Sequence, residues 1–321
     1  MKTSTKILLI VSAGLIALGM LIFAGGIFVM GFDFSSFSTA RIETATHTVE
    51  ENFNKISIKT DTADVSLQPA TDGVCRVVCN ENVKLKHSVR VEGGALLIDT
   101  VDTRKWYDYI SFGTVKTDVT VYLPKSEYDS LTVSADTGDV SLPDSFLFNT
   151  EEITVSTGDV SCNASAKGLL KIKTSTGMID MNGVSVGSVD LSVTTGKVTV
   201  KALSCDDSFN LKVSTGKAVI SNVTCKSFSS EGDTGDITLK NVLGKERLFV
   251  KRSTGHVELD HCDSSEIDVT TDTGNVKGTL ISEKIFSVKT STGKVNVPES
   301  VSGGICRIKT STGDVDIDVV Q

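Results

Sequence analysis

The chain has 321 residues, a formal net charge of −8, seven cysteines and one tryptophan. This acidic balance excludes a basic surface of the kind that binds nucleic acid or anionic lipid headgroups. The length provides for one membrane segment and one elongated domain with a continuous apolar core.

Residues 1–32 predict a cytoplasmic tail and a transmembrane signal-anchor helix. Lys2 and Lys6 precede an uncharged run over residues 7–32, longer than the ~20 residues that span a bilayer. The apolar core of a secretory signal peptide is shorter, ~7–15 residues, and a cleaved signal peptide is the alternative. The positive-inside rule predicts a single-pass protein of the cell membrane with its N-terminus cytoplasmic and the rest extracytoplasmic. Residues 33–50 are expected to be a polar linker.

Residues 51–125 predict an N-terminal β cap. Residues 56–67 have the repeat pattern described below with Ala63 in the glycine position, so they are expected to form a degenerate first coil. The residues that follow break the period and predict antiparallel strands, among them a hairpin that turns at Gly93 and Gly94. Because terminal repeats need an atypical, soluble outer face, we expect this block to close one end of the domain.

Residues 126–321 form the predicted repeat domain, in which a Thr-Gly pair recurs every 19 or 20 residues. A fixed period of this length is the mark of stacked structural repeats. Each glycine can supply the positive φ that a tight corner requires. The recurring glycines are Gly138, Gly158, Gly177, Gly196, Gly216, Gly235, Gly255, Gly274, Gly293 and Gly313.

Apolar and polar residues alternate on both sides of each glycine. With the glycine as position 0, positions −7, −5, +2 and +4 are apolar in most repeats, as Leu170 and Ile172 illustrate. This period of two predicts half-buried strands that meet at a corner. The predicted fold is therefore all-β, a single-stranded β-solenoid (β-helix) of about ten 19–20-residue coils with an N-terminal β cap, preceded by one transmembrane helix. Ten coils at ~4.8 Å would make a rod about 48 Å long.

The threonine at position −1, Thr137 in the first repeat, is present in all ten repeats. If the alternation continued through the corner, this threonine would point inward, as would the first threonine of pairs such as Thr174 and Thr176. An inward column of threonines would place hydroxyl groups near the corner amides and methyl groups in the core. We therefore expect a structural column, and no flat exposed threonine face of the kind that binds ice.

Residues 315–320 finish the last coil in the sequence, and no residues follow that could cover its outer edge. An open parallel edge is a template for further strand pairing. We therefore expect the C-terminal coil to dock a partner or another copy of the chain.

The seven cysteines are an odd number, which is unusual for a disulfide framework. Cys162, Cys262 and Cys306 fall at core positions, where cysteine acts as a small apolar residue. Cys205 and Cys225 occupy equivalent positions in adjacent coils, with expected Cα atoms ~5 Å apart. That spacing permits an inter-coil disulfide, and two stacked free thiols are the favoured alternative.

The densest set of metal-ligating residues in the repeats is His256, His261, Cys262 and Asp263. Alternation places Cys262 inward and His256 outward, so these residues are not expected to converge on one ion. His87 is isolated in the sequence. We therefore predict neither a metal site nor a cofactor.

No catalytic residues are expected, because no coil departs from 19 or 20 residues and none carries an insertion that could form a cleft. The nucleophile and phosphate-binding motifs of common enzyme classes are missing from the sequence. Trp106, Tyr107 and Tyr109 stand close together in an expected loop of the cap, where exposed aromatic rings could bind sugars or protein. The alternative is that they pack in the core of the cap.

The sequence Thr-Ser-Thr-Gly-Asp-Val at residues 310–315 has shorter copies at 174–177 and 156–160, and a strand at 121–124 ends in Tyr-Leu-Pro. In these motifs and in its N-terminal apolar segment, the chain resembles a bacterial family of adhesin-like proteins of unknown function with β-strand repeats, called toast-rack domains. The resemblance covers roughly residues 50–321. It implies an envelope protein, in some members associated with stress-response membrane regulators, and it transfers no catalytic residue.

These observations together predict a membrane-anchored extracytoplasmic β-solenoid that acts as a surface-binding, adhesin-like or envelope scaffold protein. An accessory role in a cell-envelope stress-response system is the alternative, and a glycan-processing enzyme is a third hypothesis. A stress-response role would require another membrane protein, contacted through the helix or the cap, because residues 1–6 are too few for a signalling domain. The expected partners are the membrane, envelope or membrane regulatory proteins, and extracellular ligands.

Overall fold

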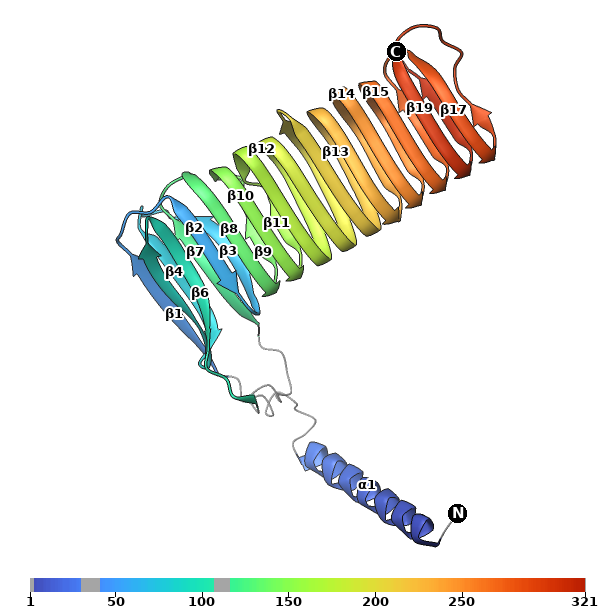
Figure 1. The fold of residues 1–321 in the computed structure, drawn as a ribbon. Coiled ribbons are helices and arrows are strands. Elements are labelled where there is room, and N and C mark those ends of the chain that lie inside the picture. The colour runs from blue at the N-terminus through green and yellow to red at the C-terminus, as the bar shows by residue number, and fades with distance from the viewer. Residues whose placement is uncertain (1–2, 30–40, 107–115, 321) are drawn as a thin grey trace.

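The computed structural model describes residues 3–29, 41–106 and 116–320, which form one apolar helix and a long stack of β-coils (Figure 1). Helix α1 spans Thr3–Val29. The strands of the N-terminal part are β1 Ile42–Val49, β2 Lys55–Thr60, β3 Ala63–Pro69, β4 Cys75–Asn82, β5 Leu85–Glu92, β6 Ala95–Asp102 and β7 Thr117–Leu123. The strands of the repeats are β8 Glu127–Thr137, β9 Val140–Leu142, β10 Leu147–Thr157, β11 Val160–Cys162, β12 Ser165–Cys205, β13 Ser208–Thr234, β14 Ile237–Thr254, β15 Val257–Thr273, β16 Val276–Leu280, β17 Lys284–Thr292, β18 Val295–Asn296, β19 Gly304–Thr312 and β20 Val315–Val319.

Helix α1 is exposed along its described length. Residues 5–26 are apolar enough and long enough to cross a membrane. By length and composition this helix suits either a membrane anchor or a signal sequence.

Adjacent coils pair in parallel and in register, so equivalent positions of the repeat stack on one another. Val189 pairs with Phe209, and the corner residues Gly196 and Gly216 pair directly. The predicted inward positions fill the core, as Leu170 and Ile172 do with no exposed surface. The predicted β-solenoid is confirmed. Alternate residues of each strand point into the solenoid, where they stack on the equivalent apolar residues of the neighbouring coils.

The corner glycines are required for two separate reasons. Their φ angles lie between +127° and +156°, a conformation that L side chains rarely adopt. A Cβ atom would also collide with the coil below: at Gly216 it would lie 1.7 Å from the carbonyl oxygen of Gly196. The Thr-Gly period is therefore set by a backbone contact that leaves no room for a side chain at the corner.

The residue after each corner glycine ties its coil to the next one. The Oδ1 atom of Asp139 accepts a hydrogen bond from the backbone N–H of Asp159 at 2.8 Å, and Oδ1 of Asp159 accepts from Met178 at 2.7 Å. Asp236 does the same for His256 at 3.0 Å. These carboxylates satisfy amides that the ladder leaves unpaired at the corner, which explains why Asp recurs after Thr-Gly.

The threonines before the corner glycines are exposed, so the prediction of an inward column is wrong. Thr137 and its nine equivalents face solvent, whereas the residue at position −3 points inward. The hydroxyl groups of Thr174 and Thr271, both at −3, donate to the carbonyl oxygens of Gly158 and Gly255 at 3.3 and 3.2 Å. The alternation fails here because positions −2 to +1 all lie on the outside of the turning chain.

The degenerate first coil and the cap have the predicted arrangement. Gly138 stacks on Ala63, since a Cβ at Gly138 would lie 2.3 Å from the carbonyl oxygen of Ala63. β2 and β3 pair on their other side with β6 and β7, so a cap coil lies outside the first coil. β5 and β6 form the predicted hairpin around Gly93 and Gly94, and β4 pairs antiparallel with β7.

Part of the predicted linker is a strand. β1, within residues 33–50, pairs antiparallel with β4 over its whole length. Its inward residues Ala45 and Val49 lie opposite Cys79 and Cys75. The linker prediction is wrong for residues 42–49, because a polar strand can extend the open edge of β4 without an apolar pattern of its own.

Chain order and stacking order differ at the C-terminal end. β19 pairs with β15 on one side and with β17 on the other, and β20 lies in the same way between β16 and β18. The coil that finishes the chain is therefore internal, and the expectation of an open edge at residues 315–320 is wrong. β17 and β18 form the outermost coil (Figure 1). Pro298 follows the short β18 and has no backbone N–H to donate to a neighbouring strand. The coil of β17 and β18 is therefore better suited to the edge than the coil of β19 and β20.

One inward position in the stack carries an acid. Glu151 occupies position −7 of its coil and is 1% exposed. The thiol of Cys162 donates to Glu151 Oε2 at 3.4 Å. Burial raises the pKa of the Glu151 carboxyl to about 8, so this side chain is largely neutral in the folded protein at neutral pH.

Replacing a corner glycine should destabilise the stack more than strain alone explains. Gly216→Ala combines a φ of +138° with the backbone collision, so we expect a loss of at least ~2 kcal/mol of unfolding free energy. Gly93→Ala is the matched control: its φ is +59°, with nothing within 4 Å of the added Cβ. It should cost only ~1 kcal/mol. Equal shifts of the denaturation midpoint would contradict the close-contact explanation.

The buried carboxyl of Glu151 should make stability fall as pH rises. Its pKa is raised from 4.5 to about 8, so the folded state binds more protons, and stability is lost progressively from about pH 4.5 to pH 8. The loss at pH 7 is on the order of 3 kcal/mol. Glu151→Gln should remove this part of the pH dependence and be more stable than wild type at pH 8. If the unfolding free energy changed by the same amount between pH 5 and pH 8 in both proteins, this prediction would be contradicted.

Candidate functional site

The aromatic loop of the cap is only partly described. Trp106 is 77% exposed, so for this residue the alternative of packing in the cap core is wrong. Tyr107 and Tyr109 lie outside the described residues. The aromatic core at this end is formed by Tyr128 instead, whose ring stacks between Phe53 and Phe148 at 5.8 and 6.1 Å.

All seven cysteines are buried free thiols. Cys205 and Cys225 follow the paired residues Ser204 and Thr224 of adjacent coils, and the structure has them unbonded, the second of the two expected alternatives. Burial raises the pKa of the Cys225 thiol to about 12. This thiol is therefore protonated at neutral pH.

The densest His and Cys set of the repeats stays dispersed. His256 accepts a hydrogen bond from the backbone N–H of Asn275 at 3.0 Å, and His261 pairs with the neighbouring Asp260. Cys262 points into the core, where its thiol donates to the carbonyl oxygen of Leu239 at 3.3 Å. Each side chain thus has a local structural contact, and these residues do not form one site.

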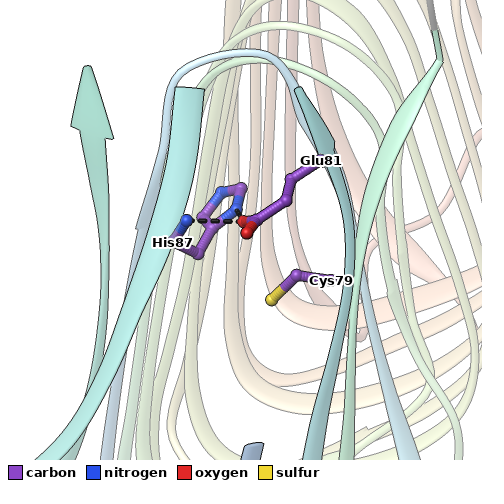
Figure 2. A group of neighbouring side chains, drawn as sticks. All are labelled: Cys79, Glu81 and His87. Carbon is purple, nitrogen blue, oxygen red and sulfur yellow. Dashed lines mark hydrogen bonds and ion pairs between the residues drawn. The ribbon is translucent and has the colours of Figure 1, made fainter. Parts of the chain in front are cut away.

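A different set converges in the cap. Cys79 and Glu81 on β4 and His87 on β5 bring a sulfur, a carboxylate oxygen and an imidazole nitrogen within 4.8 Å of one another. We call these three residues the cap cluster. Their side chains turn toward each other in the space between the two strands (Figure 2). They are 0%, 2% and 6% exposed, so the cluster is part of the interior.

The local fold explains this convergence. Alternation along β4 places Cys75, Val77, Cys79 and Glu81 on its inward face. β4 pairs with β7 and β5 pairs with β6, so these strands extend the two opposite walls of the coil. A connection of two residues joins β4 to β5, and this short turn brings His87 opposite Glu81 across the interior.

Hydrogen bonds fix the orientation of the cluster. Glu81 Oε2 accepts the backbone N–H of His87 at 2.6 Å and lies 2.9 Å from His87 Nδ1. The other ring nitrogen, Nε2, lies 3.3 Å from the hydroxyl oxygen of Thr60 on β2. Burial, with Glu81 and Asp118 nearby, raises the pKa of the Cys79 thiol to about 12. Both imidazole nitrogens therefore have polar neighbours in an otherwise apolar core.

Sequence reasoning missed this cluster because His87 has no ligand-type neighbour close to it in the chain. A signal was present: Cys79 and Glu81 stand at alternate positions of one strand, and a charged residue at an inward position requires a partner. His87 follows six residues later, across a turn. Recognising the pair would have required knowing that β4 and β5 face each other and are not hydrogen-bonded neighbours along most of their length.

The outermost coil leaves apolar side chains uncovered at the other end of the stack. Val295 at position +2 is 47% exposed, whereas its stacked equivalent Val315 is 1% exposed. Phe286 and Val288 are half-buried for the same reason. Val295 and Phe286 line a hollow together with Pro298 and the loop that follows it.

Comparison with known proteins gives one family and several distant structures. The family model described as Toastrack DUF4097 matches residues 53–216 and 204–321. No curated protein sequence matches the chain.

Among solved structures, a "putative adhesin" from Bacteroides fragilis is 13% identical with a TM-score of 0.43, covering 87% of this chain and 97% of that one. A "putative lipid binding protein" from Parabacteroides distasonis is 14% identical with a TM-score of 0.46, covering 87% and 97%. A "putative adhesin" from Parabacteroides merdae is 13% identical with a TM-score of 0.37, covering 88% and 98%. Because the two family matches together extend from residue 53 to residue 321, the chain belongs to the Toastrack DUF4097 family.

Proposed function

We propose that this protein is a membrane-anchored, extracytoplasmic rod that links envelope surfaces by end-to-end pairing of its outermost coils. The rod is adhesin-like when the paired copies stand on different cells and a scaffold when they stand on one. The observation that carries the proposal is the uncovered outermost coil, β17 and β18.

The outermost coil has an unpaired edge and an open apolar face. Among the described strands, β17 and β18 each pair with one neighbour only, so a row of backbone N–H and C=O groups faces outward. Beside this row, Val295 is exposed and Phe286 and Val288 are only half-buried, at positions that most other coils bury. Burial of this apolar surface and pairing of the edge would both favour association.

A second copy of the chain is the occupant that fits this face. Within the repeats, each coil stacks in parallel on another coil of the same repeat, with corner residues and core residues at matching positions. The outermost coil of a second copy has the same width and the same open positions, so the two coils match in size and in apolar surface, although their strands would run in opposite directions. A two-fold axis at the contact would make the paired edges antiparallel, which is the commonest symmetry of protein dimers.

The position of the outermost coil suits contact between surfaces. The cap follows α1 in the chain, and the outermost coil lies at the opposite end of the stack (Figure 1). Stacked coils at ~4.8 Å give a rod roughly 50 Å long. Anchoring through α1, with Lys2 and Lys6 on the cytoplasmic side, would hold the outermost coil far from the bilayer.

A charge placed on the outermost coil should prevent pairing. Val295→Lys puts an ammonium group where a second copy would bury it, so the apparent association constant should fall at least ~10-fold. Met178→Lys is the matched control, because Met178 is 48% exposed in the middle of the rod and Lys197 and Lys217 occupy the same repeat position. Liposomes carrying the full-length wild type or the control should cluster, and those carrying Val295→Lys should stay dispersed.

Sedimentation equilibrium of the full-length chain in detergent gives a second measurement of the same contact. Dimers of the wild type and of Met178→Lys, with monomers of Val295→Lys, are expected. A wild-type chain that stays monomeric and leaves liposomes dispersed would refute end-to-end pairing, and so would clustering that Val295→Lys does not change.

The signal-anchor predicts that the mature protein retains its N-terminal helix. Intact mass measurement of the protein extracted from membranes should give the full-length mass of 34.1 kDa, apart from any loss of the initiator methionine. Recovery of a chain that begins after residue 26, or of a protein released without detergent, would show that the helix is a cleaved signal sequence.

A further inference from the structure

We propose that the cap cluster, Cys79, Glu81 and His87, is a zinc site that ties β4 to β5 across the N-terminal end of the solenoid. This inference is independent of end-to-end pairing, which concerns the opposite end of the rod.

The three side chains supply the ligand types that zinc takes in proteins. Zinc binds cysteine sulfur at ~2.3 Å and histidine nitrogen or carboxylate oxygen at ~2.0–2.2 Å. Ligand atoms of one tetrahedral ion therefore lie ~3.3–3.8 Å apart. The ligand atoms of the cap cluster lie within 4.8 Å of one another already, so shifts of about an ångström or less would close the site.

Charge balance favours a divalent cation in this place. All three side chains are at least nine-tenths buried. A cysteine thiolate and a glutamate carboxylate carry two negative charges, which Zn²⁺ neutralises while the imidazole remains uncharged. The loaded site therefore buries no net charge, and it removes the cost of leaving these polar groups in a core.

The groups around the cluster have the arrangement of an outer shell. Metal-bound histidine usually donates its second ring N–H to an oxygen acceptor. With Nδ1 of His87 on the ion, Nε2–H can donate to the hydroxyl oxygen of Thr60, 3.3 Å away. The backbone N–H of His87, 2.6 Å from Glu81 Oε2, holds the carboxylate in place. Three protein ligands leave the fourth tetrahedral position for a water molecule.

The location gives the ion a mechanical role. β4 extends one wall of the solenoid and β5 the other, and the strands share a single bridge, between Asn82 and Leu85. Of the cap strands, β5 pairs along its length only with β6. An ion held by residues of both strands would join the two walls where few backbone hydrogen bonds do so, and would close the end of the core.

Cobalt provides a direct test, because Co²⁺ replaces zinc in such sites and a thiolate ligand adds a sulfur-to-cobalt charge-transfer band in the near ultraviolet. The full-length protein in detergent, stripped with EDTA, should bind one equivalent of Co²⁺ and show this band, and Zn²⁺ should abolish it. Cys79→Ser and His87→Gln should lose the band. Cys75→Ser, on the same inward face of β4, should keep it.

Two results would overturn the proposal. One is a wild-type protein that shows no thiolate band at saturating Co²⁺. The other is a band that persists in Cys79→Ser but disappears when another cysteine is replaced. The first result concerns the wild type alone, so it would count against the proposal even if a variant failed to fold. Zn²⁺ should also raise the thermal unfolding midpoint of the wild type and of Cys75→Ser, with no such shift in Cys79→Ser.

Discussion

The contact on which the rest of the structure depends is the packing of each corner glycine against the corner carbonyl of the coil below. At Gly196 and Gly216 a Cβ atom would lie 1.8 and 1.7 Å from that oxygen. Such close approach fixes the register of every coil, because a shift by one residue would bring a side chain into the gap. With the register fixed, inward residues stack on inward residues, and the carboxylates after the glycines reach the amides of the next coil. One backbone contact, repeated along the rod, therefore aligns the core, the corner hydrogen bonds and the exposed threonine column.

A few inward positions of the stack carry polar or charged side chains in place of apolar ones. Arg252 is buried at position −3, and Gly232 in the coil below leaves the space for it, since a Cβ there would lie 2.3 Å from Arg252 Nη1. Its guanidinium donates to the hydroxyl of Ser230 at 2.9 Å, and burial lowers its pKa to about 10. Glu151 is accommodated by losing its charge. The cap cluster differs from both because three ligand-type side chains meet there, on two strands that share a single backbone bridge.

The coil faces at the two ends of the rod are covered to different extents. A stack of coils leaves a face uncovered at each end, and apolar side chains there lose the neighbour that would bury them. At the N-terminal end, β4 and β1 extend one wall of the cap coil and β5 extends the other, and the cap cluster lies between these walls. At the other end, the chain folds its last coil inside the stack and leaves the coil with the shorter second strand outermost. The apolar surface left uncovered by the stacking of the described coils therefore lies at the outermost coil.

The repeat pattern was enough to predict the coil. The period of 19 or 20 residues, the alternation and the glycines predicted the all-β solenoid, the core positions, the first coil at Ala63 and the cap hairpin, because each of these depends on contacts within one repeat or between identical positions. The stacking order of the last two coils could not be predicted, because repeats of one kind offer each other equivalent surfaces and no local feature shows which coil lies outside. The outward direction of the corner threonines could be seen only in the structure, because the path of the chain around the corner sets it, and not the alternation along the strand. The cap cluster was hidden for a third reason: Glu81 and His87 meet across the interior of the solenoid, and such contacts depend on which walls their strands extend.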